Sequence, residues 1–303
     1  MSIFPTTLAP PDPIFHLTAS FKKSSVANKI NLGVGAYRDD SGNPWVLPVV
    51  RKAELLIVNN PALDHEYLPI DGLPAFTHAS VKLMLGDSND KVAAAQTISG
   101  TGAVRLGADF LKRFCPADVY IPDPTWGNHK AIFGDAGLKV ISYPYWDPTT
   151  KGLDFVGMIE CLNKAAPKSI ILFHPCAHNP TGVDPSQEQW KELASLCQTR
   201  NLVPFFDSAY QGFATTLDQD AWAVRYFVSQ GIELLFCQSY SKNFGLYNER
   251  CGCLAVVTIS TDKAKEVSSQ LCKLIRAGYS NPPAFGARIV SLVLNTPELA
   301  AEW

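Results

Sequence analysis

Seven short apolar runs, separated by segments of helical character, are the feature that most constrains the fold of this chain. The runs are rich in aliphatic and aromatic residues, which is typical of buried strands. Strands that alternate with helices predict an α/β domain with a mainly parallel sheet, here of seven strands. The expected strands are residues 95–99, 118–121, 139–143, 169–173, 202–206, 232–237 and 252–258.

Helices are expected before and between these strands, and the core is expected to be one long domain because no linker or repeat follows residue 48. The first 13 residues carry four prolines, which exclude a helix or a central strand and predict an extended arm. A short helix is expected to begin at Asp12-Pro13. The other expected helices are residues 49–59, 74–85, 102–114, 186–200 and 221–230.

The composition is that of a globular protein and disfavours several classes of partner. Of the 303 residues, 47% are hydrophobic and 18% are charged, with a net charge of -2. No basic stripe interleaved with aromatic residues is present, so we expect no binding of nucleic acid. No apolar run approaches the roughly 18 residues that a membrane span needs, so we expect no membrane insertion.

The eight cysteines have the spacing of neither a disulfide framework nor a zinc knuckle. With no signal peptide evident, they indicate free thiols in a reducing compartment. The start also lacks the Arg-rich character of a mitochondrial presequence, since its first basic residue is Lys22. The cytoplasm is therefore the expected location.

Polar motifs follow several of the expected strands, and ligands of an open α/β sheet bind at the carboxyl ends of its strands. Ser99-Gly100-Thr101 leaves a strand and opens a helix, which suits a phosphate, although no complete nucleotide motif is formed. Trp126 follows the next strand, where an indole is more often part of the core. His174 and His178 have metal-ligand spacing for a helix, but Pro175 and Asn179-Pro180 argue against a helix, and no third ligand is evident, so we expect no metal.

Two further strands end in ionisable residues, and each of these has an ordinary alternative role. Asp207 follows the expected strand 202–206, where it could equally cap a helix, and Tyr210 lies just beyond it. Lys242 follows the strand 232–237, where a lysine beside apolar chain gains nucleophilic character, although a solvated loop lysine is the commoner case. Arg250 could be a surface ion-pair partner.

The Ser239-x-x-Lys242 spacing also fits serine acyl-transfer enzymes. Those enzymes need S-D-N and K-T-G tripeptides, and neither occurs in this chain. Instead, an amine, an acid, phenol and amide donors, an anion site and an indole converge on one sheet edge. That set fits pyridoxal phosphate, which needs an amine for its aldehyde, an acid for its ring nitrogen and an anion site for its phosphate.

Several longer motifs resemble the aspartate aminotransferases of the cytosolic eukaryotic kind, which are fold type I pyridoxal phosphate enzymes. The resemblance runs from the amino-terminal arm to Trp303. It implies the large domain of that fold, with its mainly parallel seven-stranded sheet, plus part of a small domain. The motifs that carry it are NLGVGAYRDD, EYLPIDGL, PTWGNH, HNPTG, DSAYQGFA, SYSKNFGLYNER and SNPPAFGARIV.

This resemblance implies a role for each candidate residue. Lys242 would hold the cofactor as a Schiff base and move a proton between substrate and cofactor. Asp207 would pair with the ring nitrogen, Trp126 would stack on the ring, and Tyr210 and Asn179 would bond the phenolic oxygen. The phosphate would be bound by Ser99, Gly100, Thr101, Ser239 and Arg250.

The family's active site is shared between two subunits, so the resemblance also implies a homodimer. Tyr67 would reach the partner's phosphate, and Arg276 the side-chain carboxylate of the partner's substrate, which selects dicarboxylic amino acids and 2-oxo acids. Gly35, Trp126 and Asn179 would line the substrate site. His129 and His174 match positions that support the cofactor-binding residues.

The implied domains are an arm at 1–13, the first part of the small domain at 14–47, and the cofactor-binding large domain at 48–303. In the family the chain continues into the rest of the small domain, where a second arginine binds the α-carboxylate. The sequence ends at Trp303, soon after a helix start at Thr296-Pro297, so we expect an incomplete aminotransferase. Two alternatives stay open: another fold type I activity, such as a lyase or aromatic transaminase, and an inactive partner in a dimer.

Overall fold

The computed structural model describes residues 2–10, 13–31, 33 and 35–303. It divides into two compact units, Met1–Trp45 and Val46–Trp303. The predicted domain boundaries at 13–14 and 47–48 stay a prediction. Residues 2–10 form neither helix nor strand, as their prolines predict, whereas Met1, Pro11 and Asp12 of the predicted arm lie outside the described residues.

The described residues of the first unit form one helix, α1 (Pro13–Lys23), and a turn. The Nζ atom of Lys29 donates to the carbonyl oxygens of Phe21 and Ser24, at 2.8 and 2.6 Å, which satisfies two orphan acceptors at the helix end. A β-bridge joins Arg38 to Pro44 and closes the turn between them.

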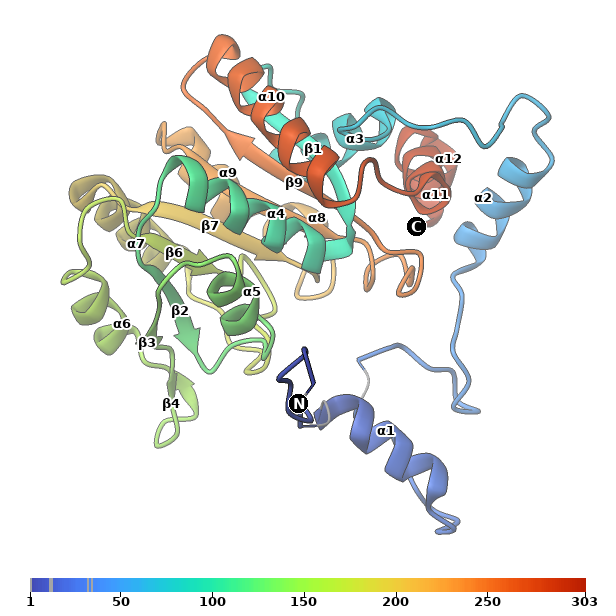
Figure 1. The fold of residues 1–303 in the computed structure, drawn as a ribbon, viewed down its shortest axis with the longest axis horizontal. Coiled ribbons are helices and arrows are strands. Elements are labelled where there is room, and N and C mark those ends of the chain that lie inside the picture. The colour runs from blue at the N-terminus through green and yellow to red at the C-terminus, as the bar shows by residue number, and fades with distance from the viewer. Residues whose placement is uncertain (1, 11–12, 32, 34) are drawn as a thin grey trace. The chain divides into compact units, whose positions relative to one another are not determined.

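The second unit is built on the predicted seven-stranded sheet (Figure 1). Strand β9 runs antiparallel to both β1 and β8, and all other neighbours are parallel, so the prediction of a mainly parallel sheet is confirmed. The strand order is β1 (Val92–Ile98), β9 (Cys251–Val257), β8 (Leu234–Ser239), β7 (Val203–Ser208), β6 (Ile170–Phe173), β2 (Val119–Asp123) and β3 (Val140–Pro144).

The first strand shows the largest shift from its predicted bounds. It was expected at residues 95–99, but it begins at Val92 and ends at Ile98. Alanine has low strand propensity, so the run Ala93–Ala95 carries little local signal, and pairing with β9 decides its conformation. Ser99 is the first residue of the following helix instead.

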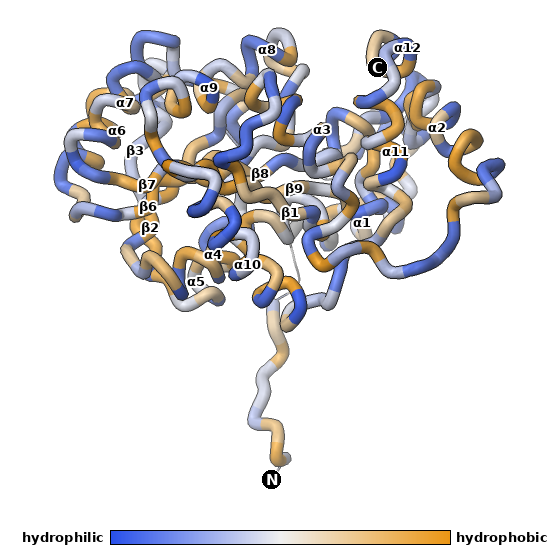
Figure 2. The backbone as a smooth tube through the Cα atoms, turned by 90° about the horizontal axis from the view of Figure 1, so that it is seen from above, coloured by the Kyte–Doolittle hydropathy of each residue, from blue (hydrophilic) through white to orange (hydrophobic). Residues whose placement is uncertain are grey.

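Helices cover both faces of the sheet, which gives a three-layer α/β fold. On one face pack α4 (Ser99–Phe114), α5 (His129–Asp135) and α10 (Thr261–Gly278), of which α4 and α10 cross the front of the sheet in Figure 1. On the other face pack α3 (Pro74–Leu85), α6 (Phe155–Leu162), α7 (Gln187–Arg200) and α9 (Trp222–Ser229). Figure 2 shows strands β2, β6 and β7 as a hydrophobic layer between two rows of helices.

Local signals fix several helix ends. Ser186 caps α7 in a capping box with Gln189, and Gly86 ends α3 in the left-handed conformation.

Beyond the end of β8, a third core cluster joins α2 (Pro48–Val58), α11 (Ala284–Asn295) and α12 (Pro297–Glu302). The helix start predicted at Pro297 is confirmed. The remaining elements are α8 (Leu217–Asp220) and the hairpin β4 (Trp146–Asp147) with β5 (Gly152–Leu153).

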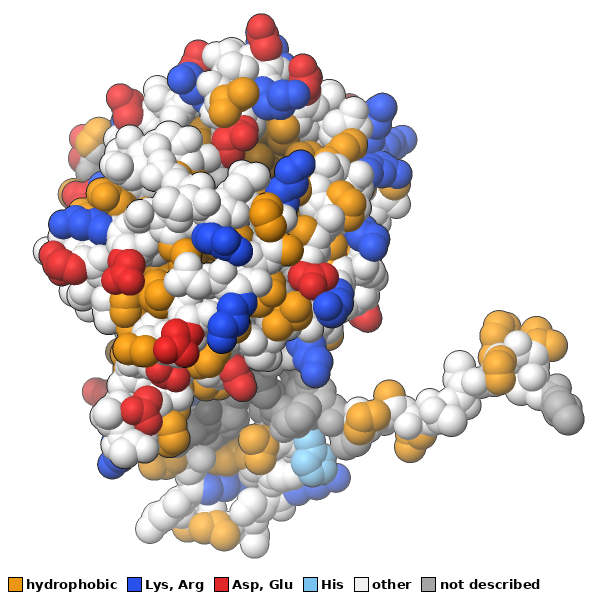
Figure 3. Space-filling model, turned by 90° about the vertical axis from the view of Figure 1, so that its left-hand side faces the viewer, with side chains coloured by type: hydrophobic (Ala, Val, Ile, Leu, Met, Phe, Trp, Pro, Cys, Tyr) orange, Lys and Arg blue, Asp and Glu red, His pale blue; other side chains and the backbone are white. Residues whose placement is uncertain are grey.

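No helix among the described residues is long and apolar enough to cross a membrane. On the face drawn in Figure 3, acidic and basic side chains are interspersed. The eight cysteines form no disulfide with one another.

Candidate active site

The carboxyl ends of the parallel strands meet at one edge of the sheet, and the predicted residues follow these ends. Strands β1 and β8 have the same direction, because both run antiparallel to β9. The turn into α4 therefore lies at the same edge as the loop after β8, which carries Lys242. This is the edge at which an open α/β sheet binds its ligands.

Three buried serine hydroxyls gather where α4 begins. The Oγ atom of Ser99 lies 2.8 Å from that of Ser241 and 3.4 Å from that of Ser239. The first turn of α4 adds backbone N–H groups and the positive end of a 16-residue helix to these hydroxyls. Such a set of donors suits an oxyanion such as a phosphate.

Two glycines allow this close approach of the chain segments. A Cβ atom on Gly100 would lie 2.9 Å from the Cβ of Ser239, and one on Gly252 would lie 2.5 Å from the backbone of Ser99. Ser99 and Arg250 both have positive φ, at 60° and 51°, and the Ser99 N–H donates to the Arg250 carbonyl at 3.0 Å. Non-glycine residues adopt this backbone at a cost of about 1–3 kcal/mol and are concentrated at functional sites.

Lys242 is half-buried beside the guanidinium of Arg250. Burial, and then the positive charge of Arg250, lower the pKa of the Lys242 amine below its ordinary value, which raises its neutral, nucleophilic fraction. Its Nζ atom lies 5.1 Å from the ring centroid of Tyr247. The Arg250 side chain is oriented by a 2.7 Å hydrogen bond from Nη1 to the Tyr247 carbonyl. A solvated loop lysine would have none of this burial.

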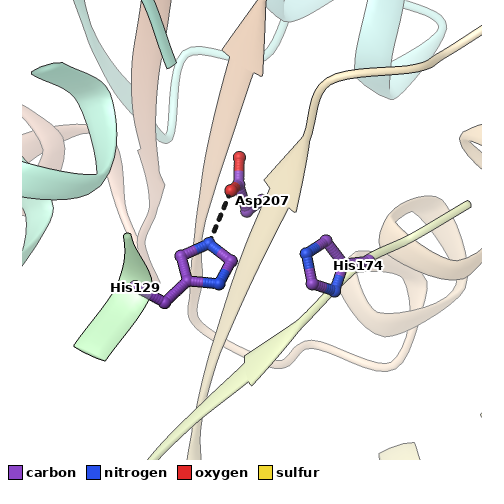
Figure 4. A group of neighbouring side chains, drawn as sticks. All are labelled: His129, His174 and Asp207. Atoms are coloured by element: carbon purple, nitrogen blue, oxygen red, sulfur yellow. Dashed lines mark hydrogen bonds and ion pairs between the residues drawn. The ribbon is translucent and has the colours of Figure 1, made fainter. Parts of the chain in front are cut away.

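Asp207 is buried at the end of β7 and pairs with His129 (Figure 4). The Oδ2 atom of Asp207 lies 2.8 Å from Nε2 of His129, whose Nδ1 lies 2.8 Å from the Thr125 hydroxyl. An ionised carboxylate only accepts, so Nε2 is the donor of this bond, and Nδ1 is the atom that meets the Thr125 hydroxyl. The alternative role of Asp207 as a helix cap is wrong, because Thr216 caps the next helix, α8.

His129, His174 and Asp207 also place three possible metal-ligand atoms within 4.8 Å of one another (Figure 4). Burial, followed by the charges of His129 and His178, holds the pKa of His174 well below its usual range, so this ring is neutral. The 2.8 Å bond already occupies the inward nitrogen of His129, so the geometry favours an Asp–His pair that orients the carboxylate. The expectation of no metal stays a prediction.

Aromatic groups complete the site. Trp126 meets the His129 ring edge to face, with 5.1 Å between centroids. Burial, then the nearby charges of Asp207 and Tyr247, raise the pKa of Tyr210, so its hydroxyl stays protonated and can donate. Tyr247 contributes to the raised pKa of Tyr210 and its ring also lies beside Lys242, so it is close to both residues.

Other predicted residues lie apart from these contacts. Tyr67 is 82% exposed between α2 and α3, and Arg276 is exposed on α10, where its Nη1 donates to Ser280. Gly35 lies in the first unit. Thr101 is in the first turn of α4 and Asn179 in the loop after β6, and their predicted ligand contacts stay predictions.

Three residues of the site were not predicted from the sequence. Ser241, Tyr247 and Thr125 contact Ser99, Lys242 and His129 respectively. All three lie inside the motifs SYSKNFGLYNER and PTWGNH, so the signal was present. Their side chains were not recognisable as ligands because a serine, a tyrosine and a threonine in a polar turn are ordinary turn residues.

The fold and the site together bring a half-buried lysine, a serine-lined helix start and a buried Asp–His pair to the ligand-binding edge of an α/β sheet. Residues 27–303 match the family model for aminotransferase class I and II. The mitochondrial aspartate aminotransferase of Gallus gallus is 55% identical over 98% of this chain and 72% of its own length. The cytoplasmic aspartate aminotransferase of Gallus gallus is 52% identical over 97% and 75%.

A solved structure agrees with these relatives. An aromatic-amino-acid aminotransferase from Burkholderia pseudomallei, covalently bound to pyridoxal phosphate, superposes with a TM-score of 0.97. It is 45% identical, and the match covers all of this chain and 77% of that one. The chain belongs to the family of class I and II aminotransferases, and the resemblance identified from its motifs is confirmed.

Proposed function

We propose that this protein transfers the amino group between L-aspartate and 2-oxoglutarate, giving oxaloacetate and L-glutamate, with pyridoxal phosphate attached to Lys242. The observation that carries the proposal is the half-buried Lys242, whose amine pKa is lowered by burial and by Arg250, at the edge of a serine-lined anion site. The relatives named as aspartate aminotransferases support the choice of substrates.

The residues present fit this cofactor. A Cβ on Gly100 would fill the space beside Ser239, so the glycine keeps open the donor cluster that a phosphate needs. Ser99, Gly100, Thr101, Ser239 and Arg250 would hold the phosphate, with Arg250 as a charge-assisted fork. When bound, pyridoxal phosphate supplies an aldehyde for amines and a ring that withdraws electrons from the substrate α-carbon.

Lys242 has two roles in this proposal. As a neutral amine it would hold the cofactor through its aldehyde, and the same nitrogen would carry the proton away from the substrate α-carbon. Its lowered pKa serves both roles, because a protonated lysine neither attacks nor accepts a proton. The Tyr247 ring, whose centroid lies 5.1 Å from Nζ, would stabilise the ammonium form of Lys242.

The remaining groups hold charge and orientation. Asp207, oriented by His129, would keep a positive charge on the ring nitrogen. Tyr210, which stays protonated, would donate to the phenolic oxygen together with Asn179. Trp126 would cover one face of the ring and exclude water. These residues would bind and orient, whereas Lys242 would move the proton.

The proposed active unit is a homodimer. Helix α2 buries Val49, Val50, Ala53 and Ile57, yet it leaves Leu55, Leu56 and Val58 more than half exposed. Exposed apolar side chains gathered on one helix favour association. Tyr67 and Arg276 are exposed, which supports their reaching into the site of a second copy. The Arg276 guanidinium would select dicarboxylic substrates by pairing with their distal carboxylate.

Mixing two inactive variants tests the shared site. Lys242→Ala and Arg276→Asp homodimers should each be nearly inactive on aspartate. After unfolding and refolding together, half of the dimers are hybrids with one intact site each, so about a quarter of the wild-type activity should return. No recovery in a mixture that is dimeric by ultracentrifugation would place both residues in one subunit.

Substrate choice is tested by comparing kcat/KM for aspartate with that for phenylalanine and tyrosine, each with 2-oxoglutarate as acceptor. The proposal predicts that aspartate is preferred. A preference for the aromatic amino acids would favour the activity named for the Burkholderia pseudomallei structure. Bound cofactor without any turnover would favour the inactive dimer partner.

The proposed location is the cytoplasm, on the ground that the cysteines are unpaired. Relatives named for the mitochondrion and for the cytoplasm both match the chain, so the family does not choose between the two. Fractionation of the natural source tests the proposal, and recovery of the protein from the mitochondrial matrix would refute it.

A further inference from the structure

Lys242 lies in a tight turn, residues 240–246, which we call the lysine turn. The Gly245 N–H donates to the Lys242 carbonyl at 3.0 Å, and the Leu246 N–H donates to the Tyr240 carbonyl at 3.3 Å. Gly245 has a φ of 63°, which this turn requires. These bonds fix the shape of the turn, but they do not fix its place against the rest of the fold.

Trp303 supplies a contact that does so. It lies at the end of α12, and its indole Nε1 donates to the carbonyl of Asn243, the residue after Lys242, at 2.8 Å. Its ring also stacks on Phe244, with 4.4 Å between centroids and 28° between planes. Phe244 is fully buried, so Trp303 contacts the lysine turn through both a hydrogen bond and a buried aromatic stack.

The same turn is tied to the part of the site that carries Tyr210. Asn243 Nδ2 donates to the backbone carbonyl of Gln211 at 3.3 Å. Gln211 follows Tyr210 directly, and its own side chain accepts from Gln238 at 2.6 Å. The contacts thus run from Trp303 through Asn243, which follows Lys242, to Gln211, which follows Tyr210.

We propose that Trp303 is a positioning residue for Lys242, which sets the place of the lysine turn and thereby the reactivity of the amine. The inference rests on the proposed function, since Lys242 must be the residue that takes the cofactor. Trp303 acts through Asn243 and Phe244, and it does not itself reach the reacting atoms. A half-buried carbonyl that loses the one donor it has among the described residues shifts toward water or a new partner, and the adjoining lysine moves with it.

The test is the rate at which the cofactor-free protein captures pyridoxal phosphate on Lys242. Capture is followed by absorbance in a stopped-flow instrument, and attachment to Lys242 is verified by borohydride reduction and peptide mapping. Trp303→Phe keeps the ring stack and removes the N–H donor, whereas Trp303→Leu removes both. Losing one neutral hydrogen bond corresponds to a factor of roughly two to ten, so we expect Trp303→Phe to capture more slowly by that factor and Trp303→Leu by more.

The matched control is Trp222→Leu. Trp222 stacks on Tyr226 in α9, with 5.0 Å between centroids and 9° between planes, so its loss removes a similar aromatic contact from another part of the fold. We expect it to lower the unfolding temperature and to leave the capture rate unchanged. If Trp303→Leu fails to fold, Trp303→Phe decides the question.

Capture at the wild-type rate by Trp303→Phe and by folded Trp303→Leu would overturn the inference. It would also be overturned if Trp222→Leu slowed capture as much as they do, because the effect would then be general destabilisation. A wild-type protein that attaches no cofactor to Lys242 would instead refute the proposed function, and this inference with it. The two failures are therefore distinguished by the wild-type protein alone.

Discussion

Replacing Asp207 tests whether its charge, rather than its shape, matters to the site. The carboxylate is buried at the end of β7 and bonded to His129 at 2.8 Å, and the His129 ring is fully buried. Its other oxygen, Oδ1, accepts no hydrogen bond from the described residues and is available to a ligand. Asp207→Asn keeps the shape of the side chain and an acceptor for His129 but removes the charge. Asp207→Ala removes the shape, the acceptor and the charge.

The expected loss of turnover follows from the burial of Asp207 and of the charge that it would compensate on the cofactor ring nitrogen. Removing one partner of a buried charge pair costs about 3–5 kcal/mol, because the other charge is left uncompensated. If that charge is the protonated ring nitrogen that withdraws electrons from the substrate, the cost raises the activation free energy of the reaction. Turnover should then fall by about two to four orders of magnitude in both variants. Similar losses of turnover in Asp207→Asn and Asp207→Ala would show that the charge of Asp207, and not its shape, is what turnover requires.

The assay couples oxaloacetate formation from aspartate and 2-oxoglutarate to its reduction, while absorbance measures the bound cofactor. Both variants should still bind cofactor through Lys242 and the phosphate site. Asp154→Asn is the control, since Asp154 caps α6 through a 2.9 Å bond from the Gly157 N–H. It should keep its turnover. A loss below tenfold in Asp207→Asn, with Ala much worse, would mean that Asp207 only holds His129 in place.

Three other predictions concern substrate, cofactor and pH. Arg276→Asp should lose most of its activity on aspartate, and its activity on basic amino acids should rise relative to that on aspartate. Unchanged aspartate kinetics would place Arg276 outside the substrate site. Gly100→Ala should weaken pyridoxal phosphate binding at least about tenfold in an absorbance titration, because its Cβ would displace Ser239 from the anion site, while Gly134→Ala, which meets open space, should not. Burial, and then the charge of His129, lower the pKa of His178 to about 4 in the folded state, whereas the unfolded value is about 6.5, so the unfolded state binds the proton first as pH falls. The unfolding free energy should therefore drop by about 3 kcal/mol through this group between pH 6.5 and 4, and His178→Gln should flatten the measured slope while exposed His78→Gln leaves it unchanged.

Much of the fold could be predicted because its local signals agree with its tertiary structure. The runs around Phe205 and Phe236 are apolar enough to be buried on both faces, and both became central strands. The first strand was placed less well, since alanines at 93–95 carry no strand signal and the pairing with β9 is a contact made over 150 residues of chain. Position along the chain identified the sheet edge, because parallel strands share one carboxyl end.

The candidate site could be predicted only in part. Lys242 and Asp207 were identifiable since ionisable residues stand out at the ends of apolar strands. The Asp207–His129 bond joins residues that are 78 apart in the chain, so its geometry appears only once β7 and α5 are in place. Trp303 gave no signal, because its contact with Asn243 crosses 60 residues and involves a backbone carbonyl, which leaves no trace in the side-chain pattern.

The most direct test of the account is to find which lysine carries the cofactor. The protein is loaded with pyridoxal phosphate, reduced with borohydride, digested and mapped by mass spectrometry. We expect a pyridoxyl group on the peptide that contains Lys242. This label should be lost in Lys242→Ala, in which the remaining lysines serve as an internal control. A pyridoxyl group on another lysine, or equal labelling of many, would contradict the placement of the active site at the end of β8.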